Sequence, residues 1–289
     1  MIRRAGFTLL ELLVGTVIAG LFATAILRIL VAENRSLATL AETRNARATA
    51  RSGVNLLLSE LRMVETEGGV EAAATDGKSL TVRDPFGFGL ICQSDPTGMV
   101  VSLLPVDPDL FALPGFSGFA WKESTASPFT YLSAASGATL TDPGPVSACE
   151  GEPEEPDRVL TLTGGRVVSL GGPLSSVPPA GMLAMLYRRV RFEFKASGVF
   201  PGRIGLWATL LDAGPLTEEV AAPFDNTARF RYFVLNDATA RDTPPASLAD
   251  LRGLEIRLNA ESGHAVAAGL GGYRRAGTTV SVMFTNRPD

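Results

Sequence analysis

The sequence has little of the chemistry on which most metalloproteins and enzymes depend. Its 289 residues include one histidine, His264, and two cysteines, Cys92 and Cys149. One histidine is too few for a histidine metal site, and the two cysteines form no Cys-x-x-Cys unit. The glycine-rich segments lack nucleotide-binding spacings, and Gly115–Gly118 is not a Gly-x-Ser-x-Gly elbow. We therefore expect no metal, no cofactor and no enzymatic activity.

Charge is also scarce. Charged residues make up 19% of the chain and the formal net charge is −4, so the chain is not a general binder of polyanions. Nucleic acid is not an expected partner unless a local basic patch exists. Five acids lie in residues 150–157, but they lack the Asp-x-Asp-x-Asp-Gly order of a calcium loop, and two prolines interrupt them. We interpret this run as a solvated loop.

Proline is absent before Pro85, and charge is nearly absent from residues 7–27, where Glu11 is the only charged residue. About 20 apolar residues suffice for a helix to cross a bilayer. Arg3 and Arg4 precede the run, which favours a cytoplasmic N-terminus. The run is longer than the apolar part of an ordinary signal peptide, and no clear cleavage site follows it. It is therefore expected to remain as a membrane-spanning helix.

The first residues contain a specific motif. A short basic leader ends at Gly6, Phe7 follows, and Glu11 lies four residues beyond Phe7 at the start of the apolar run. This order resembles the leader of type IV prepilins and type II secretion pseudopilins. The resemblance implies that a prepilin peptidase cuts between Gly6 and Phe7 and methylates the new amine. It also implies partners: other pilins, met through the N-terminal helix, and an inner-membrane assembly platform.

Glu11 is costly where it lies, because a carboxylate at the centre of a membrane helix costs about 3 kcal/mol on insertion scales. The resemblance implies that this acid pairs with the N-terminal amine of a neighbouring subunit. Such a pair would offset much of the cost and set the register between subunits. The alternative is that Glu11 lies at the level of the lipid headgroups.

The helical pattern continues beyond the membrane segment. Residues 33–66 contain no proline, and apolar residues recur with helical spacing near the end of this stretch. We expect one helix of roughly 90 Å from about Phe7 to Thr66, whose last third docks on its own domain while the part around Ala46, Ala48 and Ala50 is more polar. The predicted organisation is a leader at 1–6, a membrane and assembly helix at 7–31, its continuation at 32–67, and an exported β-rich domain at 68–289.

After Gly69 the apolar period changes from helical to alternating, which is typical of strands. Thirty glycines and nineteen prolines suit a body rich in turns. The expected class is α+β, with the long N-terminal helix packed on an antiparallel sheet of eight to ten strands. Residues 105–156 are expected to be irregular apart from a short strand near 119–121. The candidate strands are 79–83, 88–92, 99–104, a hairpin of 159–163 with 166–170, 189–195, 204–211, 230–235, 254–258 and 280–284.

Cys92 and Cys149 would be exported into an oxidising space. A disulfide between them would close a loop of 57 residues over the proline-rich region. Two reduced, buried thiols are the alternative. The sequence alone does not decide between these two states.

The C-terminal third, from Leu248 to a last strand that ends at Phe284, resembles larger minor pilins of the PilW kind and minor pseudopilin J of type II secretion. The resemblance implies a low-copy subunit at or near the tip that primes assembly of a pilus or pseudopilus. A rival hypothesis is an exported binding protein or enzyme for which the first helix is only an anchor. A third is a minor pilin that binds DNA or a surface through Arg188, Arg189, Arg191, Arg229 and Arg231.

Overall fold

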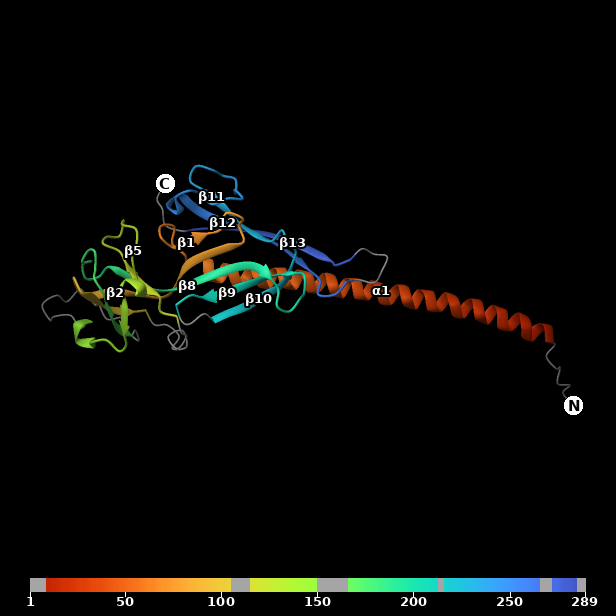
Figure 1. Ribbon diagram of the computed structural model, residues 1–289. Coiled ribbons are helices and arrows are strands. Elements are labelled where there is room, and N and C mark those ends of the chain that lie inside the picture. The colour runs from red at the N-terminus through yellow and green to blue at the C-terminus, as the bar shows by residue number, and fades with distance from the viewer. Residues whose placement is uncertain (1–8, 105–114, 150–165, 213–215, 266–271, 285–289) are drawn as a thin grey trace.

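A computed structural model shows one long helix that projects from a β-rich body, with the N-terminal end of the helix far from that body (Figure 1). The structure describes residues 9–104, 115–149, 166–212, 216–265 and 272–284. Gly6 and Phe7 lie outside these ranges, as do the acidic run at 150–157 and the first strand of the hairpin expected at 159–163.

The helix α1 (Leu9–Leu61) has 53 residues and is about 80 Å long at 1.5 Å per residue. It is uninterrupted because no proline breaks it and its second half is rich in good helix formers. It ends five residues before the expected Thr66. The chain turns there because Val64 is buried against the body, and its N–H donates a hydrogen bond to the carbonyl of Leu61 at 3.3 Å. This turn directs the chain into the first strand.

Thirteen strands make up the sheet in the described part of the chain, more than the eight to ten expected. Every pairing is antiparallel, so the α+β prediction is confirmed. The strands are β1 (Val70–Ala73), β2 (Ser79–Asp95), β3 (Gly98–Leu103), β4 (Gly118–Trp121), β5 (Thr130–Ser133), β6 (Thr139–Thr141), β7 (Val167–Gly171), β8 (Leu183–Ala196), β9 (Ile204–Leu210), β10 (Leu216–Phe224), β11 (Arg229–Val234), β12 (Leu251–Glu261) and β13 (Arg275–Met283).

The main path through the sheet is β11-β12-β10-β9-β8-β2-β3-β7-β6. The remaining strands pair at its sides: β1 with β2, β13 with β12, β4 with β8, and β5 with β4. Among the described connections there are three short 3-10 helices, at Ala134–Ser136, Val146–Cys149 and Leu248–Asp250. The strand β7, expected to form a hairpin with residues 159–163, lies between β3 and β6 in the described structure.

The strands β2 and β8 connect the two parts of the β-rich body, because each contributes side chains to two separate hydrophobic cores. Sequence patterns predicted two strands at 79–83 and 88–92, but the structure has one continuous β2 of 17 residues. Pro85, which suggested a break, lies at a bulge where the pairing with β8 shifts between Pro85 and Gly87. Proline is tolerated at such a bulge because a ladder hydrogen bond is already missing there.

The bulge separates a helix-proximal core from a distal core. In the proximal core, the C-terminal part of α1 packs against β10, β12 and β13, around the buried rings of Phe192, Phe224 and Phe230. The distal core lies beyond the bulge, among β3, β4, β7 and the far halves of β2 and β8, with Phe119 and Trp121 at its centre. In Figure 1 the distal part lies at the end of the body opposite the projecting helix.

Candidate functional site

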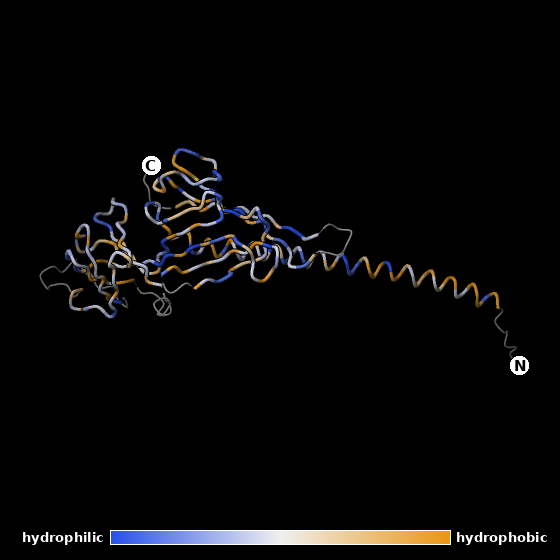
Figure 2. Tube along the Cα trace, in the orientation of Figure 1, coloured by the Kyte–Doolittle hydropathy of each residue, from blue (hydrophilic) through white to orange (hydrophobic). Residues whose placement is uncertain are grey.

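The first half of α1 carries an uncovered apolar surface. From Leu9 to Val31 its large hydrophobic side chains are exposed, with Leu9 at 83% and Phe22 at 66%. Figure 2 shows this stretch as a nearly continuous hydrophobic tube that leads away from the mixed body. The helix contains a stretch that is long and apolar enough to cross a membrane, and none of that stretch is buried against the body. A lipid bilayer or other apolar helices would satisfy this surface.

Glu11 lies near the N-terminal end of the described part of α1. Its side chain is exposed. Gly6 and Phe7, the predicted processing residues, are outside the described residues. The expected ion pair joins two subunits, so the role of Glu11 in assembly stays a prediction.

The last third of the helix docks on the sheet, as the sequence predicts. Burial begins at Ala46 and continues through Ala50, Gly53, Leu57 and Leu61. In the stretch predicted to be more polar, Ala48 is exposed, but Ala46 and Ala50 are buried against the sheet. Small side chains let the helix axis approach the sheet closely, and a Cβ on Gly53 would lie 3.2 Å from both Leu258 Cδ1 and Phe224 Cζ.

Three ionisable side chains join α1 to β2 and β8. Arg188 on β8 donates from Nε to Asp84 on β2 at 2.6 Å, and from Nη2 to Glu60 on α1 at 2.9 Å. Burial raises the pKa of Asp84 to about 8, and the nearby Glu60 carboxylate adds to the rise. One guanidinium thus faces two acids, which favours a proton on Asp84 near neutral pH. The cluster fixes the end of α1 against the bulge of β2.

A weaker polar contact lies near the other end of the docked segment. The His264 N–H donates to Glu42 Oε2 at 3.4 Å, and His264 Nδ1 lies 3.5 Å from Glu42 Oε1. The imidazole is 86% exposed. A contact this exposed contributes little to stability.

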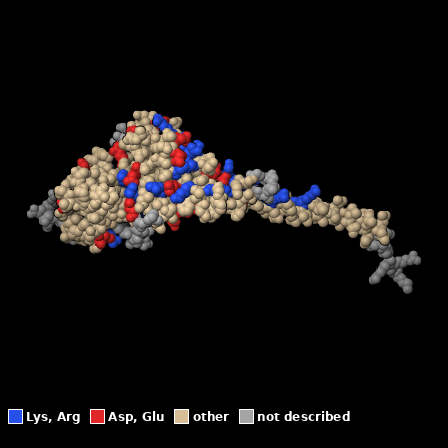
Figure 3. Space-filling model, viewed as in Figure 1, with Lys and Arg blue, Asp and Glu red and all other residues tan. Residues whose placement is uncertain are grey.

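The arginines expected to form a basic patch are mostly neutralised by acids. Arg189 pairs with Glu71 at 2.7 Å and with Asp212 at 3.1 Å. Arg231 pairs with Glu255 at 2.6 Å and with Asp242 at 2.9 Å. Positive and negative side chains are mixed over the visible face of the body (Figure 3). This arrangement disfavours phosphate binding on the sheet, because a phosphate would compete with carboxylates already in place.

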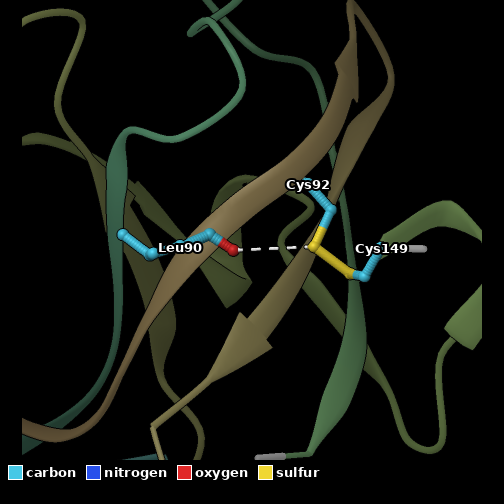
Figure 4. The surroundings of a disulfide bond; sticks show 3 residues. All are labelled: Leu90, Cys92 and Cys149. Atoms are coloured by element: carbon cyan, nitrogen blue, oxygen red, sulfur yellow. Dashed lines mark hydrogen bonds between the residues drawn. A yellow bond between two sulfur atoms is a disulfide. The ribbon is translucent and has the colours of Figure 1, made fainter. Parts of the chain in front are cut away.

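Cys92 on β2 and Cys149 form a disulfide in the structure, with their Cα atoms 4.9 Å apart (Figure 4). That spacing lies within the usual range for a bridge. Both residues are buried, and Val167 packs beside them. The Leu90 carbonyl oxygen lies 3.9 Å from Cys92 Sγ. The bridge ties the short 3-10 helix Val146–Cys149, which follows β6, to β2.

Other candidate chemistry finds a structural explanation. Within the described ranges there is no group of three or more His, Cys, Asp or Glu residues that could hold a metal ion. The Ser117 hydroxyl, in the glycine-rich stretch before β4, accepts a hydrogen bond from the Arg189 N–H at 2.8 Å. This serine therefore supports the sheet. Sequence reasoning missed the cluster of Glu60, Asp84 and Arg188, since Glu60 and Arg188 are 128 residues apart.

The comparisons with known proteins concern the N-terminal part of the chain. Residues 1–27 match the family model of the prokaryotic N-terminal methylation motif. Searches of curated proteins and of solved structures found no match. The motif and the exposed apolar helix together support a type IV pilin-like protein that is anchored in a membrane and processed by prepilin peptidase.

Proposed function

We propose that this chain is a structural minor subunit of a type IV pilus or a type II secretion pseudopilus. The observation that carries the proposal is the two-part helix: the first half of α1 is exposed and apolar, and the second half is part of the folded core. A simple anchor needs only the length that spans a bilayer. Here the same rigid element continues into the body, so the membrane segment and the exported domain would move as one piece during assembly.

The proposed maturation follows the motif. Prepilin peptidase removes residues 1–6 and methylates the amine of Phe7, while the apolar run stays on the mature chain. Arg3 and Arg4 keep the leader on the cytoplasmic side, which places the β-rich domain in the periplasm. The mature subunit then joins other pilins through α1, at an assembly platform in the inner membrane.

A position at or near the tip is part of the proposal. The C-terminal resemblance to minor pilins of the PilW kind and to pseudopilin J supports it. The shape is compatible, because the distal core lies at the end of the body opposite the membrane helix (Figure 1). A subunit there would prime assembly together with other minor subunits.

The test concerns Glu11. We expect Glu11→Ala to insert in the membrane normally and to be absent from the sheared or purified fibre, because its partner amine would lack a counter-charge in an apolar environment. Glu33→Ala is the matched control, since Glu33 lies on the same helix beyond the apolar run. Immunoblots of membrane and fibre fractions measure both variants. Normal incorporation of Glu11→Ala would contradict the pairing.

A further inference from the structure

The strand β13 forms an edge of the sheet, and its outer side has no partner strand among the described residues. It pairs with β12 along its whole length and with no other strand. Its nine residues pair with β12 without a register shift. A regular edge of this length presents a row of backbone N–H and C=O groups that can pair with another chain.

The register with β12 identifies the backbone groups that face outward. The Ser262 N–H donates to the Arg274 carbonyl at 2.7 Å, and the Phe284 N–H donates to the Arg252 carbonyl at 3.0 Å. In an antiparallel pair, such hydrogen-bonded pairs recur at every second residue. The even-numbered residues of β13 therefore direct their N–H and C=O groups toward β12, and the odd-numbered residues direct theirs away from it. The outward groups belong to Arg275, Gly277, Thr279, Ser281 and Met283.

The side chains of β13 alternate between solvent and the helix-proximal core. All five odd-numbered residues are exposed. The even-numbered Val282 is buried in the helix-proximal core, and Val280 packs against that core but is only partly buried. A strand added beside β13 would cover more of Val280 if it placed apolar side chains on the same face, because side chains directly opposite each other in a sheet are in contact.

The other edge strands in the described part of the sheet are protected. The strands β1, β5 and β6 have only three or four residues each. The edge of β11 is covered, because its outward N–H groups donate to the carbonyls of Gly77 and Arg241. The strand β10 contains two glutamates and a proline. Shortness, cover, charge and proline all prevent an edge from pairing with another chain. Residues 276–283 of β13 have no charge, no proline and no bulge.

The partner of this edge follows from its chemistry and from the position of α1. Regularly spaced N–H and C=O groups are matched by another extended backbone. Every strand pair in the sheet is antiparallel, and α1 lies beside β13 (Figure 1). Antiparallel pairing of two β13 strands would point two α1 helices in opposite directions, so that both could not enter one membrane. The partner is therefore a different polypeptide and not a second copy of this chain.

We infer that the outer edge of β13 binds an extended segment of another polypeptide as an additional antiparallel strand. Apolar side chains of that segment lie beside Val280 and Val282, and its polar side chains lie beside Thr279 and Ser281 on the solvent face. Antiparallel pairing is expected because parallel pairing is less stable per residue. The inference concerns the sheet alone, so it goes beyond the proposed function and does not depend on it.

Two synthetic peptides of identical composition test this pairing. Both alternate valine with threonine in equal numbers. With valines on the core side, the threonines lie opposite the odd-numbered residues of β13, so the threonine amides face the strand. The probe peptide is N-methylated at its valines, which leaves this edge free and blocks the far edge. The control peptide is N-methylated at its threonines, which blocks the edge that would pair.

Amide hydrogen exchange of the full-length chain in detergent, resolved by residue with mass spectrometry, measures the binding. Without peptide, the amides of Thr279 and Ser281 should exchange fast and those of Thr278 and Val280 slowly. With the probe at about 1 mM, the amides of Thr279 and Ser281 should exchange about tenfold more slowly, which corresponds to a Kd of about 0.1 mM. The control peptide should leave them unchanged.

Three results of the exchange experiment would overturn the inference. Slow exchange at Thr279 and Ser281 without peptide would mean that the edge is already covered, by this chain or by a second copy. Equal protection by both peptides would mean that the backbone does not pair as described. No protection by either peptide would mean that the edge does not accept a strand.

A proline at position 279 supplies the second arm. Thr279→Pro removes one outward N–H and leaves the hydrogen bonds to β12 in place. It should weaken probe binding about tenfold while the urea midpoint stays close to that of wild type. Thr279→Val is the matched control, because it keeps the N–H, and it should bind like wild type. Undiminished binding by Thr279→Pro would contradict the inference. None of these measurements involves the N-terminal motif, so a failure here leaves the proposed function standing.

Discussion

Asp84 is buried, with 5% of its side chain exposed, and Arg188 bridges it to Glu60 on the helix. Its pKa rises to about 8 because burial disfavours the carboxylate and Glu60 repels it. Arg188 opposes this rise without cancelling it. The residue therefore links the docking of α1 to pH, which no local sequence pattern around Pro85 would suggest.

The raised pKa of Asp84 predicts that the protein loses stability as the pH rises. An exposed Asp titrates near 3.8, and folded Asp84 near 8, so the native state keeps a proton that the unfolded chain releases. The contribution of this group to the free energy of unfolding is complete below about pH 4 and declines up to about pH 8, by at most about 1.4 kcal/mol per pH unit. Asp84→Asn should flatten that slope. Denaturant midpoints of the full chain in detergent, at pH 5 and pH 8, measure it.

A comparison of wild type with Asp84→Asn tests whether Asp84 causes this pH dependence. If wild type and Asp84→Asn lose stability equally between pH 5 and pH 8, Asp84 is ionised in the folded protein and Arg188 dominates its environment. A smaller loss in the variant than in wild type is the predicted result.

At the scale of elements, the docking of α1 depends on a close approach at Gly53. A Cβ there would meet Leu258 and Phe224 at 3.2 Å, and a longer side chain would push the helix off the sheet. We expect Gly53→Leu to destabilise the protein by about 1–3 kcal/mol through overpacking. Asn55→Leu introduces the same side chain at an exposed position of the same helix and should change stability by less than about 0.5 kcal/mol.

Urea unfolding followed by tryptophan fluorescence measures both helix variants, since Trp121 is buried in the distal core. Equal midpoints for Gly53→Leu and Asn55→Leu would mean that the helix is not held at the distance the structure shows.

The disulfide supports the distal core, whose described residues include none from α1. Closing a loop of 57 residues restricts the unfolded chain and should stabilise the protein by about 4 kcal/mol in the chain-entropy model. The double variant Cys92→Ser/Cys149→Ser should therefore unfold at lower urea than wild type. Wild type in reductant should behave like the variant. If reductant leaves the wild-type midpoint unchanged, the two thiols are not bonded in solution.

Across the whole molecule, the alternation of polar and apolar residues predicted the strands that have one solvent-exposed face and one buried face. Residues 189–195 alternate charged side chains with valine or phenylalanine, and they form the C-terminal half of β8. Patterns failed where tertiary contacts override local preference. The strand β10 was missed because its sequence holds Glu218, Glu219 and Pro223, and β2 was divided in two because a bulge accommodates Pro85.

The residues of the candidate site also differ in whether the sequence alone could point to them. Gly6, Phe7 and Glu11 could be proposed from sequence because their spacing is a local motif, and residues 1–27 match the family model of that motif. The cluster of Glu60, Asp84 and Arg188 could not, because each residue comes from a different element.

The central claim is that the chain is a processed pilin-like subunit and not a plain membrane anchor. Intact mass spectrometry of the full-length chain, expressed with and without a prepilin peptidase, tests it most directly. Gly6→Val is the matched control, because the peptidase requires a residue without a side chain at the cut, and this variant should keep its leader. The account predicts loss of residues 1–6 and one added methyl group on Phe7, only with the peptidase and only in wild type. An unprocessed wild-type chain in both cases would contradict it.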